Sequence, residues 1–115
     1  MSRLVLAAVC GLLLLATPAM AGKECGKASW YGPGFHGKKS ASGETFNQNA
    51  MTAAHKSLPF GTVVKVVDQR TDKSIEVRIN DRGPYISGRI IDLSKAAATK
   101  LGMMQAGTAK VCVYW

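Results

Sequence analysis

Asn80-Asp81-Arg82-Gly83-Pro84-Tyr85 is the most informative part of the chain, and it directly follows the run Ser74-Ile75-Glu76-Val77-Arg78-Ile79. Apolar and charged residues alternate in that run, and a period of two is typical of a strand with one buried face. Gly83-Pro84 ends the strand. Asp81 therefore lies where a rigid strand becomes a turn, a position that holds a side chain firmly and still exposes it to a ligand. The alternative is an aspartate that only caps an ordinary turn.

Residues 1–21 have the pattern of a signal peptide. Arg3 supplies a positive start, residues 4–16 are almost wholly apolar, and Ala19-Met20-Ala21 fits a signal-peptidase site. The apolar run is too short to span a membrane, and Cys10 lies inside it, where it suits lipidation poorly. We expect cleavage after Ala21 and export to the periplasm or the extracellular space without a stable membrane anchor. The alternative is an uncleaved anchor.

The remaining segment, residues 22–115, is long enough for one small domain with a modest core. The full chain carries a net charge of +8. A basic exported protein is suited to an anionic wall polymer or an anionic lipid. Nucleic acid is not an expected partner, because the sequence has no Lys/Arg run with interleaved aromatic residues. We expect a monomer.

Cys25 and Cys112 lie near opposite ends of residues 22–115. In an oxidising compartment, a cysteine pair in a small domain predicts a disulfide. No metal site and no cofactor are expected, because His36 and His55 are scattered between the cysteines without the spacing of metal ligands.

The rest of the chain reads as short strands, loops and one clear helix. We predict strands at 28–31, 51–55, 62–67, 74–79, 89–93 and 109–114, after a polar lead-in at 22–27. Ser94 is the predicted N-cap of a helix that ends before Gly102, and residues 46–50 are a candidate single helical turn. Gly61-Thr62 and Gly107-Thr108 open two similar valine-rich strands. This pattern predicts a small closed barrel, and the echo fits an internal pseudo-twofold.

Several motifs together resemble one family. The segments that carry the resemblance are Ala28-Ser29-Trp30-Tyr31-Gly32, Ser42-Gly43-Glu44, Met51-Thr52-Ala53-Ala54-His55, Leu58-Pro59-Phe60-Gly61-Thr62, Arg78-Ile79-Asn80-Asp81-Arg82-Gly83-Pro84 and Arg89-Ile90-Ile91-Asp92-Leu93-Ser94. Their order is similar to that in the rare lipoprotein A family, and the resemblance covers Ala28 to about Val113. It implies a mainly β fold, a small six-stranded double-psi β-barrel with one or two short helices.

The resemblance also implies an endolytic-type lytic transglycosylase that acts on the glycan strands of peptidoglycan. Longer family members carry a C-terminal glycan-binding domain and a lipidation cysteine, which this sequence does not show. Both departures leave the barrel motifs intact, and they concern the family's features for septal localisation and for tethering to the outer membrane.

A lytic transglycosylase cuts a glycosidic bond without water, since the 6-hydroxyl of the sugar attacks C1 and leaves a 1,6-anhydro end. One carboxyl group acts first as acid and then as base. The resemblance assigns that role to Asp81. It assigns Glu44 to tuning Asp81 or steadying the developing positive charge, and His55 to orienting Asp81 through a hydrogen bond.

The residues beside these motifs are candidates for substrate contact. Tyr31 and Tyr85 are candidates for stacking on sugar faces, with a place in the core as the alternative. Arg82 and Lys56 are candidates for binding the muramyl lactate, with a simple surface role as the alternative. Trp30 is expected in the core, and Asp92 is expected to be structural because it precedes the helix N-cap.

Two other kinds of function remain open. The first is a non-catalytic glycan-binding module, since the same barrel resembles that of expansins, which loosen walls without hydrolysis. The second is a secreted inhibitor or effector that uses the barrel as a scaffold. The trio Glu44, His55 and Asp81 favours the enzyme, because a binding module has no evident need for it.

Overall fold

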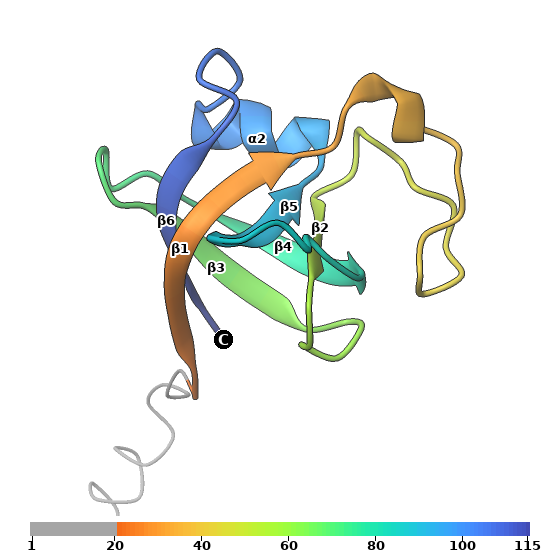
Figure 1. Ribbon diagram of the computed structural model, residues 1–115, viewed down its shortest axis with the longest axis horizontal. Helices are drawn as coiled ribbons and strands as arrows, with labels where there is room; N and C mark the ends of the chain where they lie inside the picture. The colour runs from red at the N-terminus through yellow and green to blue at the C-terminus, as the bar shows by residue number, and fades with distance from the viewer. Residues whose placement is uncertain (1–20) are drawn as a thin grey trace, which may run out of the picture.

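The computed structural model describes residues 21–115 (Figure 1). The predicted signal peptide lies outside the described residues except for Ala21. Six strands form a closed barrel in the order β1-β5-β2-β4-β3-β6, which confirms the predicted fold class. The strands are β1 (Lys23–Trp30), β2 (Thr52–His55), β3 (Val63–Asp68), β4 (Ser74–Asp81), β5 (Arg89–Leu93) and β6 (Ala109–Tyr114). A 3-10 turn, η1 (Pro33–Phe35), and one helix, α2 (Lys95–Leu101), complete the structure.

The strand pairing has an internal pseudo-twofold. Exchanging β1, β2 and β3 for β4, β5 and β6 maps the parallel pair β1–β5 onto the parallel pair β4–β2. The same exchange maps the antiparallel pair β1–β6 onto β4–β3. It also swaps β3 with β6, the two strands that Gly61-Thr62 and Gly107-Thr108 precede. The echo in the sequence therefore reflects the symmetry of the barrel.

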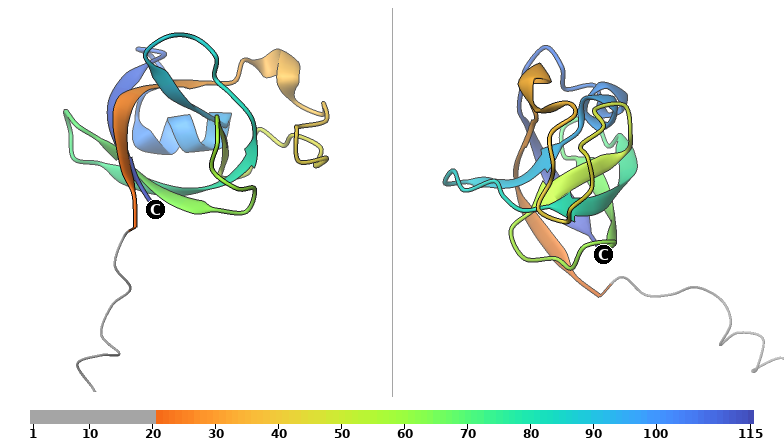
Figure 2. Two further views of the ribbon diagram at one scale, coloured as in Figure 1. Left: turned by 60° about the horizontal axis from the view of Figure 1, so that its bottom comes forward. Right: turned by 90° about the vertical axis from the view of Figure 1, so that its right-hand side faces the viewer.

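The barrel interior is filled by the branched apolar residues of the alternating strands. In β4, Ile75, Val77 and Ile79 are buried, whereas Glu76 is exposed, as the period of two predicts. The other strands add further fully buried side chains, among them Val64, Val66, Ile91, Leu93, Val111 and Val113. Figure 2 (left) shows the strands as a ring, with α2 seen through it. This packed interior fixes the strand ends that carry the candidate site.

Helix α2 begins and ends where the sequence predicts. The Ser94 hydroxyl accepts a hydrogen bond from the backbone N–H of Ala97 at 3.1 Å, which is the expected N-cap contact. Gly102 has φ +86°, a left-handed conformation that glycine adopts without strain, and its N–H donates to the carbonyls of Ala98 and Thr99. Among residues 21–115, no helix is long and apolar enough to cross a membrane.

The disulfide joins the first and last strands. Cys25 and Cys112 are direct partners in the antiparallel β1–β6 ladder, with Cα atoms 4.0 Å apart, and their sulfurs are bonded. The predicted pair is confirmed, because closure of the barrel brings two cysteines that are 87 residues apart onto opposite positions.

Two local predictions were wrong. Residues 23–27 are part of β1 rather than a polar lead-in, because β6 on one side and β5 on the other supply partners for a segment with no apolar pattern of its own. Residues 46–50 form a single hydrogen-bonded turn, in which the Ala50 N–H donates to the Asn47 carbonyl at 3.1 Å, and no helix is formed there. The second short helix is instead η1, in the long loop of residues 31–51 that projects from one side of the barrel (Figure 1).

Candidate functional site

Asp81 is the last residue of β4, and three hydrogen bonds hold its carboxylate. Its Oδ1 accepts from the backbone N–H groups of Ala41 at 2.8 Å and Arg82 at 2.9 Å, and its Oδ2 accepts from the Tyr31 hydroxyl at 2.7 Å. Gly83, with φ +115°, turns the chain sharply away after the strand. Asp81 thus lies at a strand end, as predicted, and its two oxygens differ because only Oδ1 is fixed by the backbone.

Tyr31 is a support for Asp81 rather than a free surface for stacking. Its ring stacks on Phe46 with centroids 4.4 Å apart and meets Phe35 edge-on at 5.5 Å. Burial raises the pKa of the Tyr31 phenol well above its usual range, and the hydrogen bond and negative charge of Asp81 raise it further, with a smaller effect of Asp92. The phenol therefore stays protonated and remains a donor to Asp81.

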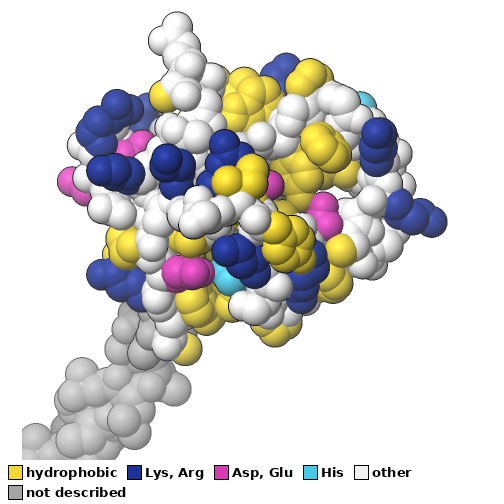
Figure 3. Space-filling model, in the orientation of Figure 1, with side chains coloured by type: hydrophobic (Ala, Val, Ile, Leu, Met, Phe, Trp, Pro, Cys, Tyr) yellow, Lys and Arg dark blue, Asp and Glu magenta, His cyan; other side chains and the backbone are white. Residues whose placement is uncertain are grey.

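A groove of about 540 Å³ lies over Asp81. Its walls come from the end of β1 and the loop after it, from the end of β4 and the loop after it, and from β5. Exposed Phe35, Tyr85 and Ile86 line it together with the cations Lys38, Lys39, Arg82 and Arg89. Figure 3 shows one face of the molecule, on which hydrophobic, acidic and basic side chains lie close together. A groove with apolar walls, a carboxylate and cations suits a sugar chain that carries negative charge.

Tyr85 is 77% exposed, so its ring is free to contact a ligand. Trp30 is partly buried and packs against the core, as expected, and it also lines the groove.

Asp92 also lines the groove, although the sequence suggested only a structural role. It lies in β5, and its Oδ1 accepts a hydrogen bond from the hydroxyl of the buried Ser29 in β1. β1 and β5 are parallel neighbours with Ser29 opposite Asp92, so the strand register sets this contact. The groove is therefore lined by two carboxylates. Asp81 accepts from two backbone N–H groups and the Tyr31 hydroxyl, and Asp92 accepts from the Ser29 hydroxyl.

Glu44 does not line the groove, and its partner is Arg78 rather than Asp81. Arg78 donates from both terminal nitrogens to the two Glu44 oxygens, at 2.7 and 2.9 Å. These hydrogen bonds hold the pKa of the Glu44 carboxyl below its usual value and raise the pKa of Arg78. The pair ties the loop of residues 38–46 to the strand that carries Asp81, and Ala41 of that loop donates to Asp81.

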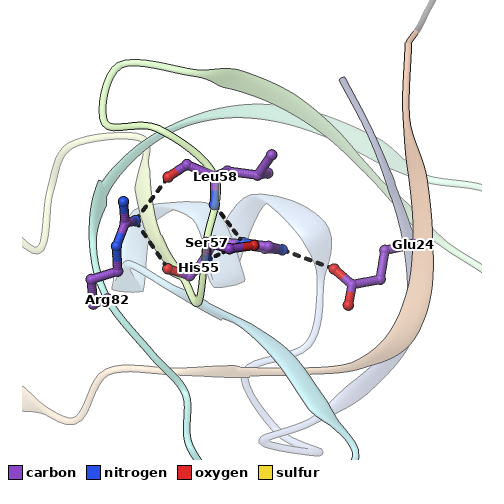
Figure 4. Close-up of polar contacts among 5 residues, drawn as sticks. All are labelled: Glu24, His55, Ser57, Leu58 and Arg82. Atoms are coloured by element: carbon purple, nitrogen blue, oxygen red, sulfur yellow. Dashed lines mark hydrogen bonds and ion pairs between the residues drawn. The ribbon is translucent and has the colours of Figure 1, made fainter.

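His55 does not orient Asp81, which corrects the expected hydrogen bond. The ring is 5% exposed, and both its nitrogens have other partners. Nδ1 accepts from the N–H groups of Ser57 and Leu58, each at 3.1 Å, and Nε2 lies 2.8 Å from Oε1 of Glu24 (Figure 4). Because β1 passes on the side of the barrel that the ring faces, Glu24 rather than Asp81 is within reach.

The two cationic candidates differ. Arg82 lines the groove, and its Nη1 donates to the carbonyls of Leu58 at 2.8 Å and His55 at 3.2 Å. Its guanidinium lies over the Phe60 ring, 4.1 Å from the centroid. Lys56 is exposed and does not line the groove. The structure thus brings Tyr31, Asp81, Arg82 and Tyr85 together, but not Glu44, His55 or Lys56.

A second hollow of about 550 Å³ lies apart from Asp81, and Lys27, Arg70 and Lys110 line it. Its one acid is Asp68, whose Oδ1 accepts from the N–H groups of Arg70 and Thr71 and so serves the β3–β4 turn. We therefore place the candidate active site in the groove over Asp81. In the part of the chain described, no group of three or more His, Cys, Asp or Glu side chains could hold a metal ion.

The groove is also lined by residues that no sequence motif marked as site residues, namely Phe35, Lys38, Lys39, Ile86 and Arg89. Phe35, Lys38 and Lys39 lie in a Gly-, Ser- and Lys-rich loop that has no apolar period. The nearness of Tyr85-Ile86 to the Asp81 motif is the one signal that pointed to this part of the groove.

A family model described as "Lytic transglycolase" matches residues 23–113. Among curated proteins, the endolytic peptidoglycan transglycosylase RlpA of Campylobacter jejuni is 59% identical over 86 residues, which cover 75% of this chain. The protein of the same name from Pseudomonas aeruginosa is 54% identical over 95 residues, or 83% of this chain. The matched segments span 31% and 28% of these two relatives, so the chain corresponds to only part of each.

Two solved structures are similar in fold. A Streptomyces papain inhibitor superposes with a TM-score of 0.64 at 22% identity, over 85% of this chain and 96% of the inhibitor. A Clavibacter michiganensis expansin variant, solved in complex with cellohexaose, gives a TM-score of 0.62 at 20% identity, over 80% of this chain and 49% of the expansin. At such identities the likeness concerns the barrel alone.

Proposed function

The chain belongs to the lytic transglycolase family, and on that premise we propose that it is an endolytic-type peptidoglycan lytic transglycosylase. It cleaves the bond between muramyl and glucosaminyl sugars and leaves a 1,6-anhydromuramyl end. The observation that carries the proposal is the Asp81 carboxylate, held by Tyr31 and two backbone N–H groups on the floor of a groove with apolar and cationic walls.

In the proposed reaction, the Asp81 carboxyl first donates a proton to the substrate and then takes one back from it. The protonated carboxyl gives its proton to the glycosidic oxygen as the C1–O bond breaks. The 6-hydroxyl of the muramyl sugar then attacks C1, and its proton returns to the Asp81 carboxylate. Oδ2 is the suited oxygen, because Oδ1 is engaged by the N–H groups of Ala41 and Arg82. The Tyr31 hydroxyl beside Oδ2 donates to the carboxylate and can rotate to accept from the protonated form.

The groove walls supply substrate contacts in this proposal. Phe35 and Tyr85 offer exposed aromatic rings to sugar faces. Lys38, Lys39, Arg82 and Arg89 surround the groove with positive charge, which suits the lactyl carboxylate of muramic acid. Glu44 acts at a distance by anchoring the loop that contacts Asp81.

We also propose that the protein is exported. A disulfide is stable in an oxidising compartment, and the relatives are named for a substrate outside the cytoplasm. The signal peptide, the absence of a membrane anchor and the monomeric state stay predictions.

The test is incubation of residues 22–115 with isolated sacculi, followed by mass spectrometry of the released material. Release of 1,6-anhydromuramyl products supports the enzyme. Asp72→Asn is the matched control for later aspartate variants, since Asp72 is exposed in the β3–β4 loop and asparagine tolerates its φ of +62°. Binding to sacculi without any such products favours the non-catalytic glycan-binding module.

A further inference from the structure

The ring of His55 is the centre of a hydrogen-bond network that the catalytic scheme above does not use. Two backbone N–H groups, of Ser57 and Leu58, point at Nδ1, so this nitrogen carries the lone pair and accepts. The proton is then on Nε2, which donates to Oε1 of Glu24 at 2.8 Å. Glu24 therefore fixes the ring orientation in which Nδ1 is the acceptor for the N–H groups of the chain's own turn.

The carbonyl side of the same turn holds Arg82. Figure 4 shows the His55–Leu58 segment between the imidazole ring and the guanidinium, with hydrogen bonds leaving it in both directions. Nη1 of Arg82 donates to the carbonyls of His55 and Leu58. The guanidinium of Arg82 lies over the face of the Phe60 ring. The N–H groups of the turn thus bind His55 while its carbonyls bind Arg82, so the shape of the turn depends on both.

We propose that His55 is a positioning residue whose Nδ1 serves as a turn-forming acceptor and, through the turn, presents Arg82 to an anionic group of the substrate. Its Nδ1 does what the side-chain oxygen of Asn or Asp does in an Asx-turn, where that oxygen accepts from N–H groups two and three residues further along. Glu24 is the second positioning residue, because it sets the ring tautomer. The anion is a carboxylate on a sugar chain, a choice that rests on the proposed function.

An acid–base role for the ring fits the structure less well. Both nitrogens are engaged, the ring is 5% exposed, and none of its contacts is with Asp81. The groove residue that the network reaches is Arg82, which is next to Asp81 in the chain and donates its own N–H to Asp81.

Two substitutions separate the functions of the two ring nitrogens. In His55→Asn the side-chain Oδ1 takes the place of Nδ1, so the turn acceptor is kept and the contact with Glu24 is lost. In His55→Gln the side-chain amide reaches toward Glu24, but the acceptor near the turn is lost. We expect His55→Asn to keep kcat/KM within about threefold. We expect His55→Gln to lose about tenfold or more, because the altered turn displaces Arg82 and weakens its charge-assisted hydrogen bond to the substrate carboxylate.

The variant that loses more activity shows whether the lost turn acceptor or poor packing is the cause. Asparagine leaves the larger void in a buried position, so a loss caused by poor packing would harm His55→Asn more than His55→Gln. Thermal unfolding of both variants checks that each is folded. Equal and severe losses of kcat in two folded variants would mean that the ring itself transfers protons, and the proposal would be wrong.

A double-substitution experiment tests the path through Arg82. If Arg82 binds a carboxylate equally in the ground state and the transition state, Arg82→Gln and His55→Gln should each raise KM on isolated sacculi with little change in kcat. The double variant should be little worse than Arg82→Gln alone, because both changes remove the same contact. Full additivity of the two effects would contradict a shared path.

A measurement without substrate separates this proposal from the enzyme assignment. Amide hydrogen exchange at Ser57 and Leu58 should be slow in the wild type and in His55→Asn, and faster in His55→Gln. Nitrogen NMR of the wild-type ring should report the Nε2–H tautomer. If sacculi release no 1,6-anhydro products but these two results hold, the catalytic proposal fails and the turn assignment stands. An Nδ1–H tautomer, or fast exchange in the wild type, would overturn the turn assignment whatever the activity.

Discussion

At the scale of single residues, the two oxygens of Asp81 have different partners. Backbone N–H groups hold Oδ1, and these donors cannot turn away without moving the chain. Among residues 21–115, Oδ2 accepts from the Tyr31 hydroxyl alone, and a hydroxyl can rotate between donating and accepting. A carboxyl group that releases and recovers a proton needs one oxygen fixed for orientation and one with an adaptable partner.

Asp81→Asn should lower turnover on sacculi by roughly 10²–10⁴, the usual contribution of general acid–base catalysis. Asparagine can still accept from Ala41 and Arg82, so binding to sacculi and thermal stability should change little. The readout is the initial rate of release of 1,6-anhydromuramyl products, with Asp72→Asn as the control. An Asp81→Asn protein that keeps most of the wild-type rate would remove Asp81 from the catalytic role.

Tyr31→Phe keeps the ring against Phe46 and Phe35 but removes the donor to Asp81. Because the folded pKa of Tyr31 is raised, the folded state binds its proton more tightly than the unfolded state does. The resulting stability is present in full below about pH 10 and is lost as pH rises toward the higher folded pKa.

Ultraviolet titration should reveal a tyrosine component that resists ionisation above about pH 10 in the wild type and is absent from Tyr31→Phe. The substitution should also slow turnover by about tenfold, since it removes a hydrogen bond to a charged group. If the wild type instead shows one more tyrosine ionising at about pH 10 than Tyr31→Phe does, Tyr31 is not the shielded donor described here.

At the scale of elements, two contacts between distant segments stabilise the structure around the groove. The disulfide clamps β1 to β6, and the Glu44–Arg78 pair clamps the 38–46 loop to β4. The first acts on the stability of the whole fold. The second is exposed and acts on the position of Ala41 beside Asp81.

Replacing both Cys25 and Cys112 with serine should lower the free energy of unfolding by about 2–4 kcal/mol, because the open chain gains conformational freedom when unfolded. Urea unfolding measures the difference, and reduction of the wild type should reproduce it. The variant should still fold, since its strand pairs and its core are unchanged. Equal unfolding curves for the oxidised wild type and the double variant would mean that the disulfide does not make this contribution to the free energy of unfolding.

Glu44→Gln and Arg78→Gln should lower turnover by similar, modest factors, and the double variant should resemble either single one. Each change breaks the same charge-assisted contact and loosens the same loop. The measurement is again product release. A much larger effect of Glu44→Gln than of Arg78→Gln would indicate that the Glu44 carboxylate acts on the substrate directly.

At the scale of the whole molecule, charge is the feature most relevant to a large anionic polymer. The chain carries a net charge of +8. Some of its cations line the groove, and others line the hollow of Lys27, Arg70 and Lys110. Cations in both places attract an anionic polymer at long range, but only the cations beside the groove lie next to the candidate site.

Binding to sacculi should weaken as salt rises, because surface charges are screened beyond about 10 Å at 0.1 M. Lys38→Gln/Lys39→Gln should reduce this salt dependence more than Lys27→Gln/Lys110→Gln, a control with the same loss of charge. Co-sedimentation at several salt concentrations gives both slopes. An affinity that does not depend on salt would make the positive charge incidental, and equal slopes for the two variants would mean that no single face is used.

Local signals in the sequence predict several elements of the fold. The period of two fixed β4 and placed Asp81 at its end, and Ser94 and Gly102 marked the limits of α2. The paired Gly-Thr starts indicated the pseudo-twofold, and the two cysteines indicated the disulfide. Each of these features depends on neighbouring residues or on composition, which a sequence displays directly.

Contacts between distant side chains follow from the folded barrel and not from local sequence patterns. Tyr31 reaches Asp81 across 50 residues, and His55 reaches Glu24 across 31, from a segment that looked like a polar lead-in. Asp92 lines the groove beside Ser29 because the strand register places these two residues opposite each other. Such contacts depend on barrel closure, on the order β1-β5-β2-β4-β3-β6 and on side-chain direction, none of which leaves a periodic trace in the chain. The physical reason is that hydrogen-bond partners are chosen by distance in space, whereas sequence patterns report only distance along the chain.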